Sequence, residues 1–230
     1  MTARIAVFAS GRGSNLHALY AHLERAGGAE IVLVASDRAS SEALTWARGR
    51  GIAASTLDSG GNDANGIIHI LSASRADYVV LAGYLRLVPP EVVRAFRGRM
   101  LNVHPALLPA FGGPGMYGAR VHRAVLASGT RLSGPTVHFV DEIYDHGAII
   151  AQWPVPVFSD DTESTLASRV LRAEHLLLPR VTRLVASGRI RLNEDGRIAA
   201  AEPQHDGAAF LFATPEDDAL AESMASAIGG

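Results

Sequence analysis

Two polar side chains that could act on a single bond lie two positions apart in the segment Asn102-Val103-His104-Pro105. On an extended strand, side chains with this spacing point to the same face, and Pro105 ends the strand. An amide donor and a titratable imidazole aimed at one point suit an acyl-type transfer, because together they stabilise a developing oxyanion and move a proton. The simpler alternative is that His104 is a hydrogen-bonded structural residue.

A second group of residues has the composition of an anion-binding loop, Ser10-Gly11-Arg12-Gly13-Ser14-Asn15. It follows an apolar run and precedes a predicted helix, so backbone N–H groups, the positive helix end and the Ser14 and Asn15 side chains can face one ligand. A single phosphate fits best, since Leu16 breaks the dinucleotide pattern G-x-G-x-x-G and the loop lacks the lysine of a Walker motif. The alternative is a tight turn whose glycines only permit the backbone geometry.

Other titratable residues are less specific. The loop from Asp141 to His146 is rich in carboxylates, and a carboxylate near a histidine raises the pKa of the imidazole, but the spacing does not say which acid would do so. Its composition alone is that of a solvated turn. His138 lies within a predicted strand, where a core position is the simpler interpretation. Glu174 and His175 lie in the middle of a predicted helix, either at an exposed edge or against a substrate.

Composition excludes several kinds of chemistry. The 230 residues include no Cys, and all 21 basic residues are Arg, so disulfides, thiolate nucleophiles, Schiff-base lysines and Walker loops are ruled out. The nine His show no metal-ligand spacing, which predicts that no metal is bound. The formal charge of -2 argues against a protein that wraps nucleic acid. Apolar runs are far shorter than a membrane helix and no leader is evident, so a cytoplasmic location is expected.

Hydrophobic patterning predicts an α/β fold. Apolar runs alternate with helix-period segments through the first hundred residues, and runs that are apolar throughout are typical of a parallel sheet covered on both faces. We therefore expect a doubly wound, mostly parallel sheet with helices on both faces. The predicted strands are 4–9, 30–35, 52–57 and 77–82, and the predicted helices are 15–25, 40–48, 64–73 and 90–96.

The pattern changes after residue 100. Asp160 or Asp161 is expected to cap a long helix over 162–187, which Pro179 should kink or split. The turn Asn193-Glu194-Asp195-Gly196 predicts a hairpin. Residues 201–230 form an acidic, Ala-rich tail that we expect to be poorly ordered or weakly helical. The other predicted elements are strands at 101–104, 136–140, 148–157, 190–192 and 197–199 and a helix at 120–128.

Six stretches, in this order, resemble the folate-dependent formyltransferases, over residues 4–195. Asn-x-His-Pro followed by Leu-Leu-Pro is the part shared most widely among formyl-transfer enzymes. The stretches are Ser10 to Asn15, Leu81-Ala82-Gly83-Tyr84-Leu85-Arg86, Leu101 to Pro109, Thr136-Val137-His138-Phe139-Val140, Asp145-His146-Gly147-Ala148-Ile149-Ile150 and Arg169-Val170-Leu171-Arg172-Ala173-Glu174-His175.

The resemblance implies an activity, which is transfer of a formyl group from 10-formyltetrahydrofolate to the amine of glycinamide ribonucleotide in de novo purine synthesis. Both are small-molecule substrates, and neither a metal nor a covalent enzyme intermediate is implied. We expect one formyltransferase domain over 1–200, with a phosphate-binding half (1–100) and a formyl-transfer half (101–200). No nucleic acid or membrane partner is expected, and the chain would be a monomer or homodimer.

The resemblance also implies residue roles. Asn102, His104 and Asp145 would form the catalytic set. The acceptor would bind to Gly13, Ser14, Asn15 and Glu174, and the folate to Leu85, Arg86, Leu87, Val88, Val140 and Asp141. Two features depart from the family pattern. Leu171 stands where a polar or basic residue is frequent, so its phosphate contact is lost or passes to Arg172, and the Gly-rich stretch 111–118 is longer than in some relatives.

Three alternatives remain open on the sequence. A formyltetrahydrofolate hydrolase uses a similar triad but usually carries an N-terminal regulatory domain. A methionyl-tRNA formyltransferase is expected to add a C-terminal β-barrel and a basic RNA surface. A nucleotide-binding module without catalysis would use the phosphate loop alone and leave the Asn/His/Asp set without a purpose.

Overall fold

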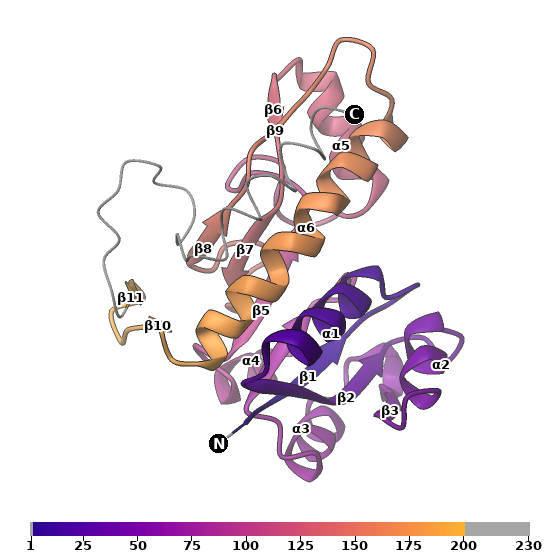
Figure 1. The fold of residues 1–230 in the computed structure, drawn as a ribbon, viewed down its shortest axis with the longest axis vertical. Coiled ribbons are helices and arrows are strands. Elements are labelled where there is room, and N and C mark those ends of the chain that lie inside the picture. Colours follow the sequence, from indigo (N-terminus) through magenta and orange to yellow (C-terminus); the bar gives the residue numbers. More distant parts are fainter. Residues whose placement is uncertain (1, 201–230) are drawn as a thin grey trace.

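A seven-stranded sheet organises the protein, for which a computed structural model describes residues 2–200 (Figure 1). The strand order is β3-β2-β1-β4-β5-β7-β8, and pairing is parallel from β3 to β5. The doubly wound, mostly parallel fold predicted from the sequence is confirmed. The strands are β1 (Ala3–Phe8), β2 (Ala29–Ser36), β3 (Ala53–Thr56), β4 (Tyr78–Leu81), β5 (Met100–His104), β7 (Thr136–Phe139) and β8 (Ile149–Gln152).

Helices cover both faces of the sheet. On β1, Ile5 and Val7 pack with the first, second and last helices, whereas Ala6 and Phe8 pack with the third and fourth. This alternation explains why the strand is apolar throughout, since each of its two faces is buried. The helices are α1 (Ser14–Ala26), α2 (Glu42–Arg48), α3 (Ala64–Ala73), α4 (Pro90–Ala95), α5 (Ala119–Ser128) and α6 (Glu163–Ala186), with a 3-10 turn, η1, at Asp58–Gly60.

The strand order reverses next to β1. The chain runs from β1 outward to β2 and β3, then returns to β4 on the other side of β1. The loops that follow β1 and β4 therefore diverge, which opens a crevice at the carboxyl ends of these strands. Ser10 ties the two loops together, because its backbone N–H donates to the Gly83 carbonyl (3.1 Å) and its hydroxyl accepts from the Leu85 N–H (3.0 Å).

Two antiparallel strands extend the sheet beyond β5. β7 pairs with β5, and β8 pairs with β7. The prediction of one strand over 148–157 was wrong, because the chain leaves the sheet at Trp153-Pro154 and Val155–Pro156 (β9) pairs instead with Leu132–Ser133 (β6). Pro154 lacks an N–H and cannot continue the ladder, which explains the break.

The long helix α6 lies across the sheet beside α1 (Figure 1). It is unbroken at Pro179, so of the two predicted outcomes the proline does not split the helix, and a kink there stays a prediction. Thr162 is the N-cap, in a capping box with Thr165, and neither of the predicted aspartates takes that place. Asp161 instead holds Arg169 through two hydrogen bonds of 2.7 and 2.9 Å.

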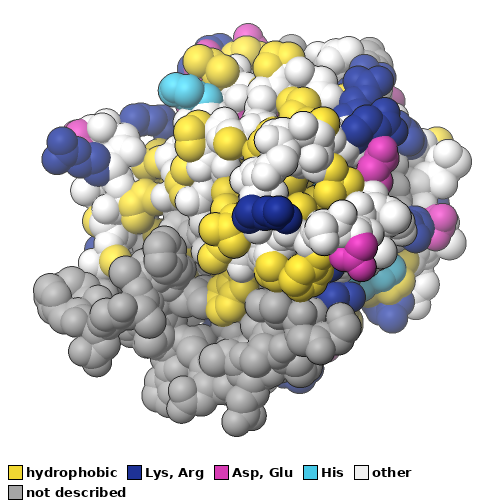
Figure 2. All heavy atoms as spheres, turned by 90° about the horizontal axis from the view of Figure 1, so that it is seen from above, with side chains coloured by type: hydrophobic (Ala, Val, Ile, Leu, Met, Phe, Trp, Pro, Cys, Tyr) yellow, Lys and Arg dark blue, Asp and Glu magenta, His cyan; other side chains and the backbone are white. Residues whose placement is uncertain are grey.

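The remaining described elements are small. Ile190–Leu192 (β10) and Ile198–Ala200 (β11) form the predicted hairpin. The tail 201–230 lies outside the described residues. Arg side chains are scattered among acidic and apolar ones on the face seen in Figure 2, in keeping with the formal charge of -2. Among residues 2–200, none of the helices combines the length and apolar character needed to cross a membrane.

The Asp161–Arg169 pair makes stability depend on pH. Hydrogen bonds from Arg169 lower the pKa of Asp161 from 3.8 to about 2, so the native state favours the ionised carboxylate. We expect Asp161→Asn to lower the free energy of unfolding at pH 7 by about 1–3 kcal/mol. The difference from wild type should shrink as the pH falls from about 4 towards 2, where the carboxylate becomes protonated.

Urea unfolding at pH 7, 4 and 2.5 measures this dependence. Arg123→Gln, which breaks an exposed ion pair with Glu163, serves as the control and should change stability little. A constant difference between Asp161→Asn and wild type across this range would contradict the assignment.

Candidate active site

A cavity of about 590 Å³ lies at the carboxyl ends of β1, β4 and β5. The residues that line it come from both halves of the chain, including Asn15 after β1, Asn102 and His104 on β5, and Asp145 after β7. Glu174 enters from α6. The structure therefore brings the predicted catalytic set, two of the predicted acceptor-binding residues and all six predicted folate residues to one cavity. The six are Leu85, Arg86, Leu87, Val88, Val140 and Asp141.

Asn102 is fixed by a histidine on the neighbouring strand. In the antiparallel pairing of β5 and β7, His138 stands opposite Asn102. The Nδ1 of His138 lies 2.8 Å from the Phe139 carbonyl oxygen, which only accepts, so Nδ1 carries the proton. Nε2 is then an acceptor and takes a hydrogen bond from the Asn102 amide at 3.0 Å. Asn102 keeps a second amide hydrogen for a ligand.

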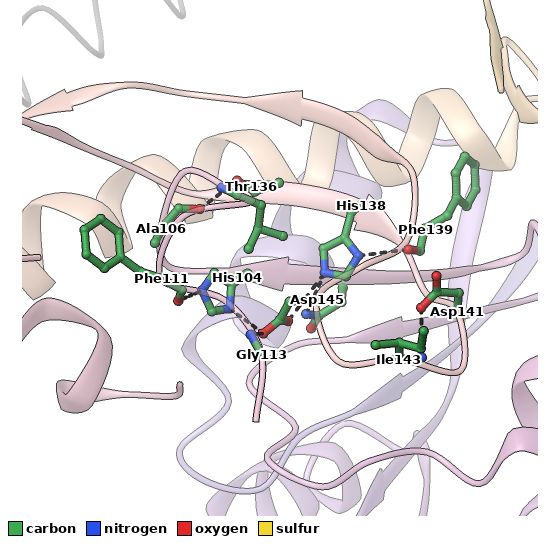
Figure 3. A network of polar contacts seen from close by, with 12 residues as sticks. His104, Ala106, Phe111, Gly113, Thr136, His138, Phe139, Asp141, Ile143 and Asp145 are labelled. Carbon is green, nitrogen blue, oxygen red and sulfur yellow. Dashed lines mark hydrogen bonds and ion pairs between the residues drawn. The ribbon is translucent and has the colours of Figure 1, made fainter. Parts of the chain in front are cut away.

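His104 is held from both sides of its ring. Its Nε2 donates to the Phe111 carbonyl oxygen (2.9 Å), and its Nδ1 lies 3.4 Å from Oδ2 of Asp145 (Figure 3). The same Asp145 oxygen accepts from the Gly113 N–H at 2.9 Å. His104 is 3% exposed, so these groups rather than water determine the ring's orientation.

The charges in this group are set by burial and by pairing. Burial alone would raise the pKa of Asp145, but the hydrogen bond with His104 and the Gly113 N–H outweigh it, and the pKa is lowered. Burial lowers the pKa of His138, so that imidazole is neutral and its Nε2 accepts. The site therefore contains an ionised carboxylate beside His104 and a neutral histidine beside Asn102.

Both groups that hold His104 come from residues in an uncommon backbone conformation. Phe111 has φ 57° and Asp145 has φ 53°, in the left-handed region that favours glycine. Such conformations cost about 1–3 kcal/mol each and gather at functional sites. Gly112 lies between them, where a Cβ would stand 2.6 Å from Leu108 Cδ2 and 3.1 Å from Asp145 Cβ. The close approach of these two loops therefore favours glycine at 112, since a larger residue would displace Leu108 and press on Asp145.

A buried threonine anchors the chain that follows His104. The Thr136 hydroxyl donates to the Ala106 carbonyl (2.6 Å) and accepts from the Leu108 N–H (3.0 Å). Gln152 on β8 donates to both Thr136 Oγ1 and the Leu108 carbonyl. The added antiparallel strands thus satisfy the backbone of the segment 105–109 and fix its path.

Asp141 organises the loop that carries Asp145. Its carboxylate accepts from the Ile143 N–H (2.9 Å) and contacts His146 Nδ1 (2.6 Å). Gly147 then packs so tightly that a Cβ there would lie 1.9 Å from the Phe139 carbonyl oxygen. Asp141 lines the cavity, but its carboxylate contacts Ile143 and His146 within its own loop.

The loop after β1 has the form expected of an anion site. Gly13 precedes α1 at φ 80°, and a Cβ there would lie 3.0 Å from Ala43 Cβ. The Gly11 carbonyl accepts from the Ser41 hydroxyl and the Ala43 N–H, which fixes the loop against α2. Arg12 and Asn15 line the cavity, whereas Gly13 and Ser14 are not among its lining residues.

Asn15 and Glu174 form a buried polar pair from α1 and α6. Asn15 Nδ2 donates to Glu174 Oε2 at 2.6 Å, and Asn15 is 6% exposed. Within the described residues, the Asn15 Oδ1 atom has no hydrogen-bond partner. Burial raises the pKa of Glu174 to about 7. This pair offers both donors and acceptors at the cavity.

The predicted folate segment gives the cavity an apolar wall. Leu85 and Leu87 are 36% and 39% exposed, and Ile143 and Tyr144 across the opening are exposed as well. Apolar side chains that line a cavity and meet water suit a flat aromatic ligand. Arg86 Nε lies 3.6 Å from the buried Asp37 carboxylate, while the Arg86 side chain itself remains exposed.

Comparison with known proteins agrees with this site. The sequence profile described as Formyl transferase matches residues 3–182. The chain belongs to the formyl transferase family. It is 44% identical over 200 residues to the chloroplastic phosphoribosylglycinamide formyltransferase of Arabidopsis thaliana, across 84% of this chain and 68% of that protein. It is 37% identical over 198 residues to the phosphoribosylglycinamide formyltransferase of Escherichia coli strain K12, across 83% and 91%.

Solved structures of formyltransferases share the fold. Glycinamide ribonucleotide transformylase 1 from Symbiobacterium toebii superposes with a TM-score of 0.80 at 37% identity, over 87% of this chain and 95% of that one. A formyltetrahydrofolate deformylase from Pseudomonas syringae has a TM-score of 0.76 at 23% identity, over 88% of this chain and 67% of that one. That second likeness concerns the fold alone, so the fold does not separate transfer from hydrolysis.

Sequence reasoning missed part of this formyltransferase site. His138 is 2% exposed and lines the cavity, so the favoured interpretation as a core residue was wrong. His122 on α5, also buried and lining the cavity, was not singled out, and burial lowers its pKa. Leu171 lines the cavity but Arg172 does not. In the part of the chain that the structure describes, no three His, Asp or Glu side chains are grouped as metal ligands.

Glu174 should make the stability of this formyltransferase fall with rising pH. Its pKa is raised from 4.5 to about 7, so the native state holds a proton that the unfolded chain releases between these values. Relative to Glu174→Gln, the wild-type free energy of unfolding should fall by about 3 kcal/mol between pH 4.5 and pH 8.

Chemical denaturation at half-unit pH steps gives this difference directly. Glu163→Gln is the control, because the hydrogen bond with Arg123 lowers the pKa of Glu163, and no fall with rising pH is expected from it. Parallel pH profiles for wild type and Glu174→Gln would show that folding does not raise the pKa of Glu174.

Proposed function

We propose that this formyltransferase transfers the formyl group of 10-formyltetrahydrofolate to the amine of glycinamide ribonucleotide in purine biosynthesis. The observation that carries the proposal is the convergence of Asn102, His104 and Asp145 on one cavity with the loop after β1 and Glu174. Relatives from Arabidopsis and Escherichia coli are named phosphoribosylglycinamide formyltransferases, which supports the acceptor.

Asn102 would stabilise the oxyanion. The acceptor amine attacks the formyl carbon, a C–N bond forms, and negative charge develops on the formyl oxygen. The amide hydrogen of Asn102 that does not bond His138 can donate to this oxygen. His138 then acts as a positioning residue, since its neutral Nε2 keeps the amide nitrogen turned in one direction.

His104 would supply a second donor beside a fixed negative charge. The ionised Asp145 lies 3.4 Å from Nδ1 and, with the Phe111 carbonyl, fixes the orientation of the ring. Its Nε2–H already meets the Phe111 carbonyl, so the formyl oxygen must share or displace that bond. The amine proton passes to the departing N10 as the C–N10 bond breaks, through Asp145 or an ordered water.

The cavity suits both substrates. Leu85, Leu87 and Val88 offer an apolar wall for the pterin ring system, and the loop after β1 faces the acceptor from the opposite side. Asn15 and Glu174 line the cavity as a hydrogen-bonded pair and can exchange hydrogen bonds with ribose hydroxyls. A cytoplasmic location and a monomeric or homodimeric state remain predictions from the sequence.

One assay separates transfer from its alternatives. The protein is mixed with 10-formyltetrahydrofolate, with and without glycinamide ribonucleotide, and loss of the formyl group is followed by absorbance. Deformylation that requires the ribonucleotide supports transfer, and deformylation without it supports hydrolysis. Absence of both would contradict a catalytic role and leave the binding module.

The catalytic roles predict large losses on substitution. Asn102→Ala and His104→Ala should each lower kcat at least about 100-fold, because each removes a donor to charge that exists mainly in the transition state. Steady-state kinetics of folded protein, checked by circular dichroism, measures this. Near-normal turnover in either variant would remove that residue from the mechanism.

A further inference from the structure

His122 is a buried histidine in the cavity wall that the transfer chemistry does not use. It lies on α5, lines the cavity and is 5% exposed. Among the described residues, its Nδ1 is enclosed without a hydrogen-bond partner. Its Nε2 has no partner there either but is not enclosed, so Nε2 is the nitrogen that opens on the cavity. Since buried polar groups are nearly always paired, this nitrogen is available to a ligand.

The ring is neutral and offers a donor. Burial lowers the pKa of His122, the nearby His104 lowers it further, and Glu163 opposes this shift. A neutral imidazole carries one N–H. A proton on Nδ1 would leave an enclosed N–H without an acceptor, which is rarer in proteins than an unsatisfied lone pair. We therefore assign the proton to Nε2, which makes His122 an uncharged donor at the cavity.

His122 lies on the side of the cavity assigned to the acceptor. Its helix, α5, packs against α6, and α6 presents Glu174. Burial raises the pKa of Glu174 and His104 partly opposes this, so both Glu174 and His122 lie within electrostatic reach of His104. The apolar folate segment comes from the loop after β4 instead. An acceptor that extends from Glu174 towards His104 would therefore pass His122.

The acceptor has one polar group that is still without a partner. The loop after β1 is assigned to the phosphate, the pair of Asn15 and Glu174 to the ribose, and the β5 residues to the formyl oxygen. The carbonyl of the glycinamide group lies between the ribose and the amine and needs a donor. Ala167 and Leu171, which line the same part of the wall, have no donor in their side chains. An uncharged N–H suits this uncharged carbonyl.

We propose that Nε2–H of His122 donates to the amide carbonyl oxygen of the acceptor, which makes the site specific for an amine that carries this carbonyl. The inference rests on the proposed function for the identity of the acceptor. The bond fixes the group next to the amine and so the direction from which the amine approaches. Because the carbonyl does not react, the bond is made in the ground state as well, and its loss acts mainly on KM.

A one-atom change in the acceptor tests this contact. The thioamide analogue of glycinamide ribonucleotide has sulfur, a weaker acceptor, in place of the carbonyl oxygen. Isothermal titration measures the Kd of both compounds for wild type, His122→Leu and His122→Gln. Wild type should prefer the oxygen compound about 10-fold, and His122→Leu should bind both compounds about equally. His122→Gln should retain part of the preference, because its amide N–H can replace Nε2–H.

His175→Leu is the matched control. The Nε2 of His175 is also enclosed without a partner among the described residues, and burial lowers its pKa, but this residue does not line the cavity. Its loss should leave the preference for oxygen unchanged. Equal affinity of wild type for the two compounds would overturn the inference, whether or not the variants fold. So would a full preference in folded His122→Leu, checked by thermal unfolding.

The transfer assay separates this inference from the proposed function. His122→Leu should raise the KM for glycinamide ribonucleotide about 10-fold, with a small change in kcat and none in the KM for the folate. If wild type shows the oxygen preference, His122→Leu loses it and neither transfers a formyl group, the proposed function fails and the contact stands. If both proteins transfer with the same KM and the same preference, the contact fails and the proposed function stands.

Discussion

The antiparallel register between β5 and β7 is the constraint that orients the catalytic strand, because it sets the hydrogen bond between Asn102 and His138 and the position of Thr136. β7 pairs with β5 so that His138 faces Asn102 and Thr136 faces His104. A shift of one residue would turn both partners to the other face of the sheet. The same register places Thr136 where it fixes the backbone after His104, so one strand pairing orients both the amide and the chain that follows the imidazole.

The left-handed conformations of Phe111 and Asp145 follow from the contacts that both residues make with His104. Two loops from different parts of the chain approach His104 from opposite sides, and each delivers one acceptor. The conformational cost of the two residues, about 1–3 kcal/mol each, is offset by the buried hydrogen bonds that they complete. Gly112 permits the close approach of the two loops, so both acceptors are in place around His104 without a ligand, as preorganised electrostatic stabilisation requires.

Local patterns were sufficient to predict the fold class and most of the cavity. The spacing of Asn102 and His104, and the loop after the first strand, follow from short-range rules that hold in any parallel sheet. The role of His138 could not be predicted in this way, because its partner lies 36 residues earlier and is set by strand pairing. The N-cap of α6 was also mispredicted, because local sequence does not show which distant side chain binds a candidate cap. Asp161 has good capping chemistry, but Arg169 occupies its carboxylate and Thr162 takes its place.

The distribution of charge explains how one cavity can serve an anionic acceptor and a reaction that creates an anion. Acidic side chains are paired or, in the case of Glu174, carry a raised pKa, so they oppose the phosphate less than their number suggests. Arg12 lies at the α1 end, and His104 with Asp145 lies on the β5 side. In the proposed reaction, an acceptor held at its phosphate would place its amine toward the second region without contacts to the small reacting group. Binding energy from the remote phosphate is then available to orient the amine. A water molecule has no phosphate and cannot use this binding energy. In the proposed transfer, the acceptor-binding end of the cavity is therefore the part that favours the amine over water as the nucleophile.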